Sequence, residues 1–165
     1  MIKKVKIPFN SKIPLDLQLG DKIEISGKIY TGRDAALPKL VDLIKKGENH
    51  LELAGSAIMH TAVSDAGISP TTSNKVEIEG SMVFLSKHGV KIHIGKGSLN
   101  KETIKSLLKY DSFFVVTPPA AALLTSKVIS KKVVAFPEES IEAIYELNVD
   151  RIPGIVSVAH GKTLN

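Results

Sequence analysis

The chain has 165 residues, of which 43% are hydrophobic and 24% are charged, a composition typical of a folded globular protein rather than a disordered one. Its formal net charge of +5 comes from lysines dispersed among acidic residues. Because there is no basic run and only 5% of the residues are aromatic, nucleic-acid binding is not expected. Cysteine is absent, which excludes disulfides, thiolate metal ligands and a cysteine nucleophile.

Neither a membrane span nor a signal peptide is expected. No apolar run approaches the roughly 18 residues that a membrane-spanning helix needs. The N-terminal segment MIKKVKIPFN contains lysines but no apolar stretch behind them. Together with the absence of cysteine, these features favour a cytoplasmic protein, and the length predicts a single domain over residues 1–165.

The first third of the chain predicts strands and one helix. Apolar residues alternate at 3–9 and 21–30, as in half-buried strands, and 51–60 reads as a short buried strand that runs into a glycine-containing loop. Between them, apolar residues from 36 to 44 recur at helical spacing. We expect Asp34 to cap this helix and Gly47 to end it.

The segment from residue 69 onward fits two patterns. KVEIEG alternates like a strand, but the apolar positions from Val76 onward also suit a helix that reaches FLSKHG. We expect the helix, with Thr71 to Ser73 forming its N-terminal turn.

The remainder of the chain alternates between strands and helices. We expect strands at 90–95, 112–117, 131–136 and 152–161, and helices at 98–110, 118–126 and 137–147. Ser98 or Asn100 would cap the first of these helices. Strands that alternate with helices predict an α/β domain with a mixed or antiparallel part near the N-terminus.

Three cationic side chains are expected where strands end and loops begin, which is where α/β proteins bind ligands. They are Arg33 in TGRD, Lys75 in SPTTSNK and Lys96 in GKG. The glycines beside Lys96 leave space in which a substrate could approach the backbone. The sequence has no GxGxxG or Walker motif, so a small dianion suits these cations better than a nucleotide.

Each of these features also has a purely structural interpretation. Pro-Thr-Thr-Ser is commonly a turn with a helix cap, and GKG after a strand is commonly a turn. The five histidines show no metal-ligand spacing, and we expect His93 to be a surface or packed residue. The residues alone therefore predict an α/β domain with a candidate anion site.

Five segments in order resemble the β subunit of two-subunit class I fumarases, a family that includes the C-terminal domain of single-chain class I fumarases and the related L-tartrate dehydratase β subunit. They are LGDKIEISGKIYTGRDAA, SPTTSNK, IGKGSLNKE, TPPAAALL and NVDRIPGIVSVAHGK. The resemblance implies a swivelling β/β/α domain, with a mixed sheet flanked by helices, that closes over a 4Fe-4S cluster. Cysteines of a partner α subunit would hold the cluster, so this chain would supply no metal ligand.

The same resemblance implies a hydro-lyase of the tricarboxylic acid cycle, a fumarate hydratase that is active only with its α subunit. The substrate would be a small dicarboxylate, and a β–β dimer would lie within an α2β2 assembly. Carried over by position, Thr71 is the catalytic base and Lys96 assists it, while Arg33, Lys75 and Thr72 bind substrate. A threonine alkoxide needs nearby positive charge, and two carboxylates need cations.

Four positions depart from the family pattern. Leu37 stands where histidine is usual, Ser69 where glycine is usual, and Lys75 where arginine is usual, and Pro118-Pro119 replaces a Gly-Gly pair. Lysine keeps the charge of arginine but loses its planar fork. The substrate therefore stays open between fumarate, tartrate and another hydroxy-diacid. A non-catalytic anion-binding module is the alternative of another class.

Overall fold

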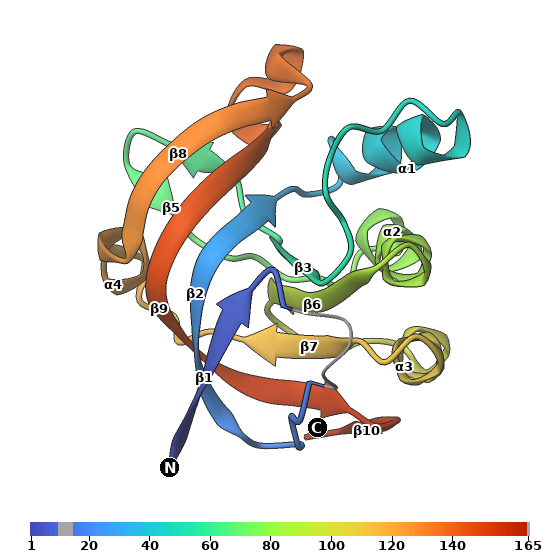
Figure 1. The fold of residues 1–165 in the computed structure, drawn as a ribbon, viewed down its shortest axis with the longest axis vertical. Helices are drawn as coiled ribbons and strands as arrows, with labels where there is room; N and C mark the ends of the chain where they lie inside the picture. Colours follow the sequence, from blue (N-terminus) through green and yellow to red (C-terminus); the bar gives the residue numbers. More distant parts are fainter. Residues whose placement is uncertain (10–14, 165) are drawn as a thin grey trace.

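Five strands pair with one another in a closed ring. The structure, a computed structural model, describes residues 1–9 and 15–164. The strands of the ring are β2 (Lys22–Thr31), β3 (Ser56–Met59), β6 (Val90–Gly95), β7 (Phe113–Val116) and β9 (Ile144–Ala159). Pairing is parallel from β2 through β3 and β6 to β7, and antiparallel where β9 joins β7 to β2. The ring is therefore a small mixed barrel (Figure 1).

Further strands extend the barrel at its edges. β1 (Ile2–Ile7) lies parallel to the first half of β2, and β10 (Lys162–Thr163) pairs with the end of β9. β8 (Val128–Ala135) pairs antiparallel with the first part of β9, and Figure 1 shows the two curving together. A separate hairpin consists of β4 (Val63–Ser64) and β5 (Gly67–Ile68).

Helices flank the barrel, as the α/β prediction requires. In Figure 1, α1 (Leu37–Lys45), α2 (Val76–Lys87) and α3 (Lys101–Lys109) lie on one side, and α4 (Ala121–Ser126) lies on the other. The Asn100 side chain accepts a hydrogen bond from the Thr103 amide at 2.8 Å, which confirms Asn100 as the cap of α3. α4 begins after the two prolines rather than at them.

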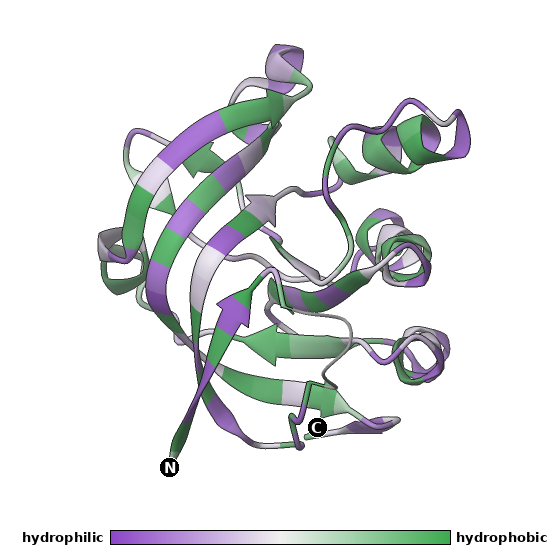
Figure 2. Ribbon diagram, viewed as in Figure 1, coloured by the Kyte–Doolittle hydropathy of each residue, from purple (hydrophilic) through white to green (hydrophobic). Residues whose placement is uncertain are grey.

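The barrel interior is filled by aliphatic side chains from every strand of the ring. Ile25, Ala57, Ile92, Val115 and Val156 are each fully buried there. Figure 2 shows β7 as almost entirely hydrophobic, as expected of a strand covered on both faces. Burial of each large aliphatic side chain stabilises the fold by about 1.5–3 kcal/mol. The core therefore fixes the strand ends at which the candidate site lies.

Two predictions near the candidate site are wrong. Asp34 does not cap α1, because the helix begins at Leu37 and its N-cap is Ala36. The residues Thr71–Ser73 do not form the first turn of α2, whose N-cap is Lys75. Their backbone groups bond instead to the ends of β3 and β6, which are partners distant in sequence.

The predicted helix at 137–147 is also wrong. Residues Pro137–Glu142 form a 3-10 turn, and Ser140 has a φ of 56° that interrupts helical geometry. From Ile144 onward the chain is β9, which pairs with both β2 and β8. Tertiary pairing thus overrides the local helical pattern.

In the segment 51–60 the glycine precedes the strand, since Gly55 (φ 72°) lies before β3.

Candidate active site

The carboxyl ends of four parallel strands lie along one edge of the barrel. Thr31 of β2 is level with Met59 of β3, which is level with Ile94 of β6, and Gly95 is level with Val116 of β7. Beyond the strands, the Gly32 amide donates to Met59 O at 3.0 Å and the His60 amide donates to Ile94 O at 2.7 Å. Arg33, His60 and Lys96 are therefore positioned just past this edge, where α/β proteins bind ligands.

The loop of residues 69–75 is attached to the same edge through its backbone. The Thr71 amide donates to His60 O at 2.9 Å, and the Lys96 amide donates to Thr71 O at 3.2 Å. The Ser73 amide donates to Lys96 O at 3.0 Å, which completes a parallel bridge between Thr72 and Lys96. The structure thus brings together Thr71, Thr72 and Lys96, three of the five predicted site residues.

The glycines beside Lys96 are required by this attachment. A Cβ on Gly95 would clash with Ser73 Oγ and lie 3.0 Å from His60 Nδ1. A Cβ on Gly97, which has a φ of 81°, would lie 2.9 Å from Thr72 Oγ1. The space that we expected for a substrate is occupied by the loop itself, so the glycines serve the close approach of two backbones.

The two threonine hydroxyls have different environments. Thr71 is half-buried, and its hydroxyl donates to His60 O at 3.2 Å. Thr72 is exposed, and its hydroxyl donates to the Asn74 side chain at 2.8 Å. Only Thr71 therefore combines partial shielding from water with a fixed position next to Lys96.

Lys75 is tied to the segment that follows β2. Its ammonium lies 3.4 Å from the Asp34 carboxylate, and both side chains are partly exposed. An ion pair of this kind contributes only about 0.2–1 kcal/mol. It nevertheless connects the loop that carries Thr71 to the residue next to Arg33, a contact of Asp34 that the helix-cap prediction missed.

The Arg33 side chain carries a buried hydrogen-bond donor. Its Nε is buried and has no partner within the described part of the chain, residues 1–9 and 15–164. A buried N–H without an acceptor is costly, and a guanidinium binds carboxylates through paired N–H groups. The Arg33 side chain is therefore equipped to receive an anionic group that reaches this edge.

His60 is a residue near the site that the sequence did not single out. Its ring is fully buried, and Nδ1 lies 2.5 Å from Ser73 Oγ. Burial lowers the pKa of His60 to about 3, because the charged ring would lose its hydration. The one available signal was its position directly after the buried strand 56–59. His93 is also fully buried, which confirms the packed alternative of that prediction.

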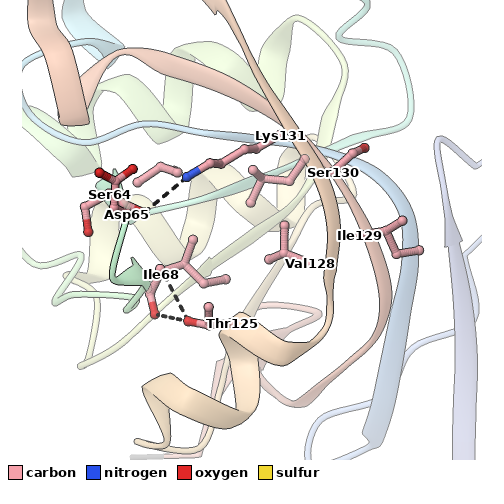
Figure 3. Close-up of a pocket in the computed structure, with 11 residues that line it drawn as sticks. Ser64, Asp65, Ile68, Thr125, Val128, Ile129, Ser130 and Lys131 are labelled. Carbon is pink, nitrogen blue, oxygen red and sulfur yellow. Dashed lines mark hydrogen bonds between the residues drawn. The ribbon is translucent and has the colours of Figure 1, made fainter.

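A cavity of about 230 Å³ lies apart from these residues. It is lined by the β4–β5 hairpin, the end of α4, and β8 (Figure 3). At its floor, Thr125 Oγ1 accepts from the Ile68 amide at 3.1 Å and donates to Ile68 O at 3.3 Å. The cavity contains none of the five predicted site residues, but these bonds anchor the hairpin that leads into the 69–75 loop.

The edge carries hydroxyls and cations together with the Asp34 carboxylate and the buried His60 ring. Within residues 1–9 and 15–164, no three His, Cys, Asp or Glu side chains lie together as a metal site. No helix in the same ranges is long and apolar enough to cross a membrane. The side chains gathered here can bind carboxylates and position a hydroxyl.

Nearly the whole chain matches a known family. Residues 6–164 match the family described as Fumarase C-terminus. A provisionally named L(+)-tartrate dehydratase subunit beta of Methanocaldococcus jannaschii is 34% identical over 166 residues, which covers 90% of this chain and 83% of that protein. The L(+)-tartrate dehydratase subunit beta of Escherichia coli strain K12 is 28% identical over 140 residues, covering 79% and 68%.

A fumarase of the same bacterium is also similar. Fumarate hydratase class I, anaerobic, of E. coli strain K12 is 26% identical over 148 residues, which covers 83% of this chain and 27% of that enzyme. This chain thus spans most of the tartrate dehydratase β subunits but about a quarter of the fumarate hydratase. The family match and the identity to the M. jannaschii protein show that the chain belongs to the fumarase C-terminus family.

Proposed function

We propose that this chain is the β subunit of a hydro-lyase that reversibly hydrates fumarate to L-malate and is active only with an α subunit. The observation that carries the proposal is the backbone pairing of Thr71 with Lys96 at the edge where Arg33 also lies. Family membership supports the reaction class, because the relatives bear the names of fumarate hydratases and tartrate dehydratases.

The cations would bind the two carboxylates of the substrate. Arg33 can offer its Nε–H, which has no partner among residues 1–9 and 15–164, together with a second guanidinium N–H to one carboxylate. Lys75 would bind the other as a point charge, after exchanging its contact with Asp34 for the substrate. The exposed Thr72 hydroxyl can turn from Asn74 toward a carboxylate oxygen. Two fixed anchor points orient the carbon from which the proton is removed.

Thr71 would remove the proton from C3 of malate. Its hydroxyl now donates to the His60 carbonyl, and loss of that proton to solvent before substrate binds would leave the alkoxide that accepts the C3 proton. A threonine alkoxide forms near neutral pH only beside positive charge, and Lys96, which is backbone-bonded to Thr71, is the cation placed to provide it. In the hydration direction the same hydroxyl returns the proton to C3.

We infer that a Lewis acid from outside this chain assists the departing hydroxyl. Within residues 1–9 and 15–164 no three His, Cys, Asp or Glu side chains lie together as a metal site, and the sequence has no cysteine. We assign the 4Fe-4S cluster, whose open iron supplies Lewis acidity when bound, to the cysteines of the partner α subunit. This chain would then contribute half of a shared site.

The assembly follows from the same proposal. The whole chain would act as one swivelling domain that closes over the α subunit, and two β subunits would meet in a cytoplasmic α2β2 enzyme. The match from residue 6 to 164 supports a single unit.

Co-expression with the α subunit under anaerobic conditions tests the proposal. We expect turnover of malate and fumarate by the complex, and an iron-free, inactive chain when it is purified alone. Turnover by the isolated chain would contradict a shared site. A complex that binds diacids without converting them would favour the anion-binding module.

Tartrate is the second candidate substrate. It is favoured by the 34% identity to the M. jannaschii protein, which is higher than the 26% identity to the fumarate hydratase. Assays of the same complex on both tartrate enantiomers separate the two, because only a tartrate dehydratase would prefer one of them to malate.

A further inference from the structure

Two buried histidine–serine pairs lie side by side beneath the candidate site. In the first, His60 Nδ1 is 2.5 Å from Ser73 Oγ, and in the second, His93 Nε2 is 2.7 Å from Ser86 Oγ. The two rings lie 6.0 Å apart between their centroids and are both fully buried. The pairs differ in what they connect, since Ser73 belongs to the 69–75 loop and Ser86 to helix α2.

His60 contacts the loop at three points. Its ring bonds to Ser73, while its carbonyl accepts from the Thr71 amide at 2.9 Å and from the Thr71 hydroxyl at 3.2 Å. The His60 amide is itself fixed to Ile94 O at 2.7 Å. One residue at the end of a core strand thus fixes both Thr71 and a residue two positions further along the chain.

The hydrogen bond between the His60 ring and Ser73 involves a neutral imidazole. Because burial keeps the His60 ring neutral, one ring nitrogen carries a proton and the other does not. Nε2 has no partner among residues 1–9 and 15–164, so Ser73 is the group that the ring engages in that part of the chain. Any side chain on Gly95 would fill the space in which this contact forms. The pair is therefore enclosed by the core on one side and the loop on the other.

We propose that His60 is a positioning residue of the reaction, which aligns the Thr71 hydroxyl with Lys96 through its bond to Ser73 and through its carbonyl. The role rests on the proposed function, in which Thr71 is the base. His60 does not touch the substrate and exchanges no proton with it. Its contribution is to keep Thr71 in the geometry that proton removal from carbon requires.

The chain offers a matched control. Ser73→Ala and Ser86→Ala each remove one buried hydroxyl from a buried, neutral histidine, so a purely structural role predicts similar effects of the two changes. We expect similar losses in thermal stability. In the isolated full chain, only Ser73→Ala should accelerate hydrogen exchange of the Thr71 amide, by about fivefold or more. Unchanged exchange at Thr71 in Ser73→Ala would overturn the proposal without reference to activity.

The assembled α–β complex supplies the second readout. Ser73→Ala should lower kcat by roughly tenfold to a hundredfold and change KM by less than about threefold, while Ser86→Ala leaves both near the wild-type values. Equal losses of kcat in the two variants, in proportion to their stability, would overturn the positioning role. If the wild-type complex converts no diacid, the proposed function fails, and the exchange measurement alone decides whether His60 positions Thr71.

Substitution of His60 itself completes the test. His60→Asn places an amide near the position of Nδ1 and should retain most of the activity, whereas His60→Leu keeps the backbone bonds but removes the ring bond. We expect a loss of kcat in His60→Leu and its recovery in His60→Asn. Equal activity of the two variants would show that the ring bond to Ser73 is not used.

Discussion

Thr71 and Lys96 are joined through their backbones, because the Lys96 amide donates to the Thr71 carbonyl at 3.2 Å at the carboxyl end of β6. The contact does not depend on either side chain. Substitutions that remove the Thr71 hydroxyl or the Lys96 ammonium should therefore leave the loop attached to the barrel. A loss of activity in such variants can therefore be attributed to the missing side chain and not to detachment of the loop.

The first prediction concerns the proposed base. Thr71→Ala should lower kcat of the complex by about 10²–10⁴-fold, the range typical of a lost general base. Thr71→Ser keeps a hydroxyl and should retain much more activity. The measurement is steady-state kinetics on malate, with size-exclusion chromatography to verify that the complex still assembles. Activity of Thr71→Ala within a few-fold of wild type would eliminate Thr71 as the base.

The second prediction concerns Asp34. Asp34→Asn should release the Lys75 ammonium and alter KM for the diacid more than kcat, since the ion pair competes with substrate for the same cation. The thermal midpoint should hardly change, because partly exposed ion pairs contribute little to stability. Kinetics and thermal unfolding of one preparation test both statements. A large loss of stability with unchanged KM would indicate that Asp34 is only structural.

The third prediction concerns substrate preference. Lys75→Arg introduces a planar, bidentate carboxylate donor where the chain has a point charge. We expect the ratio of kcat/KM for malate to that for tartrate to change by about tenfold or more, since each 1.4 kcal/mol of differential binding is tenfold. Lys87→Arg, an exposed site in the last turn of α2, is the control. An unchanged ratio in Lys75→Arg would exclude position 75 as a determinant of specificity.

The sequence located the candidate residues relative to the strands better than it predicted the local structure of the loops around them. Arg33 and Lys96 were placed at strand ends because the alternating patterns that precede them are strong, and the parallel pairing brought those ends together. Thr71–Ser73 and Asp34 were misassigned to helix ends because their true partners are His60, Lys96 and Lys75, which local pattern does not reveal. The importance of His60 likewise depends on tertiary contacts.

The fourth prediction is a pH dependence of stability. Burial lowers the pKa of His60 to about 3 and that of His93 well below its usual 6.5, with the neighbouring His60 adding to the effect on His93. In the unfolded chain both rings take up protons below pH 6.5, whereas the folded chain excludes those protons. The unfolded state therefore binds more protons, and stability falls as pH decreases from 6.5 toward 3.

The loss of unfolding free energy at acidic pH can be measured. With a pKa of about 3 in the folded chain, His60 should remove about 1.4 kcal/mol of unfolding free energy per pH unit below 6.5, or about 3 kcal/mol at pH 4.5, and His93 should add to this loss. Urea unfolding at pH 7.5, 5.5 and 4.5 provides the free energies. The His60→Asn variant should lose the part of this dependence that His60 produces. A stability that is flat between pH 7.5 and 4.5 would mean that the rings accept protons in the folded state.

The last prediction compares the substitution of alanine for Gly95 with the same substitution at Gly80. Gly95→Ala would place a methyl group against Ser73 Oγ and within 3.0 Å of His60 Nδ1, so the 69–75 loop must shift or the fold must lose stability. Gly80→Ala lies in the exposed middle of α2, where no other described part of the chain comes within 4 Å of the added Cβ, and should instead stabilise the chain by about 0.5–1 kcal/mol.

The double variant Gly95→Ala/Ser73→Ala identifies the origin of the defect. Removing Ser73 Oγ makes room for the new methyl group, so the double variant should recover stability relative to Gly95→Ala alone while its kcat stays below wild type. Thermal unfolding of the isolated chain and kcat of the complex measure the two effects separately. No recovery of stability would mean that the methyl group is opposed by the His60 ring and the loop backbone, and not by the serine hydroxyl.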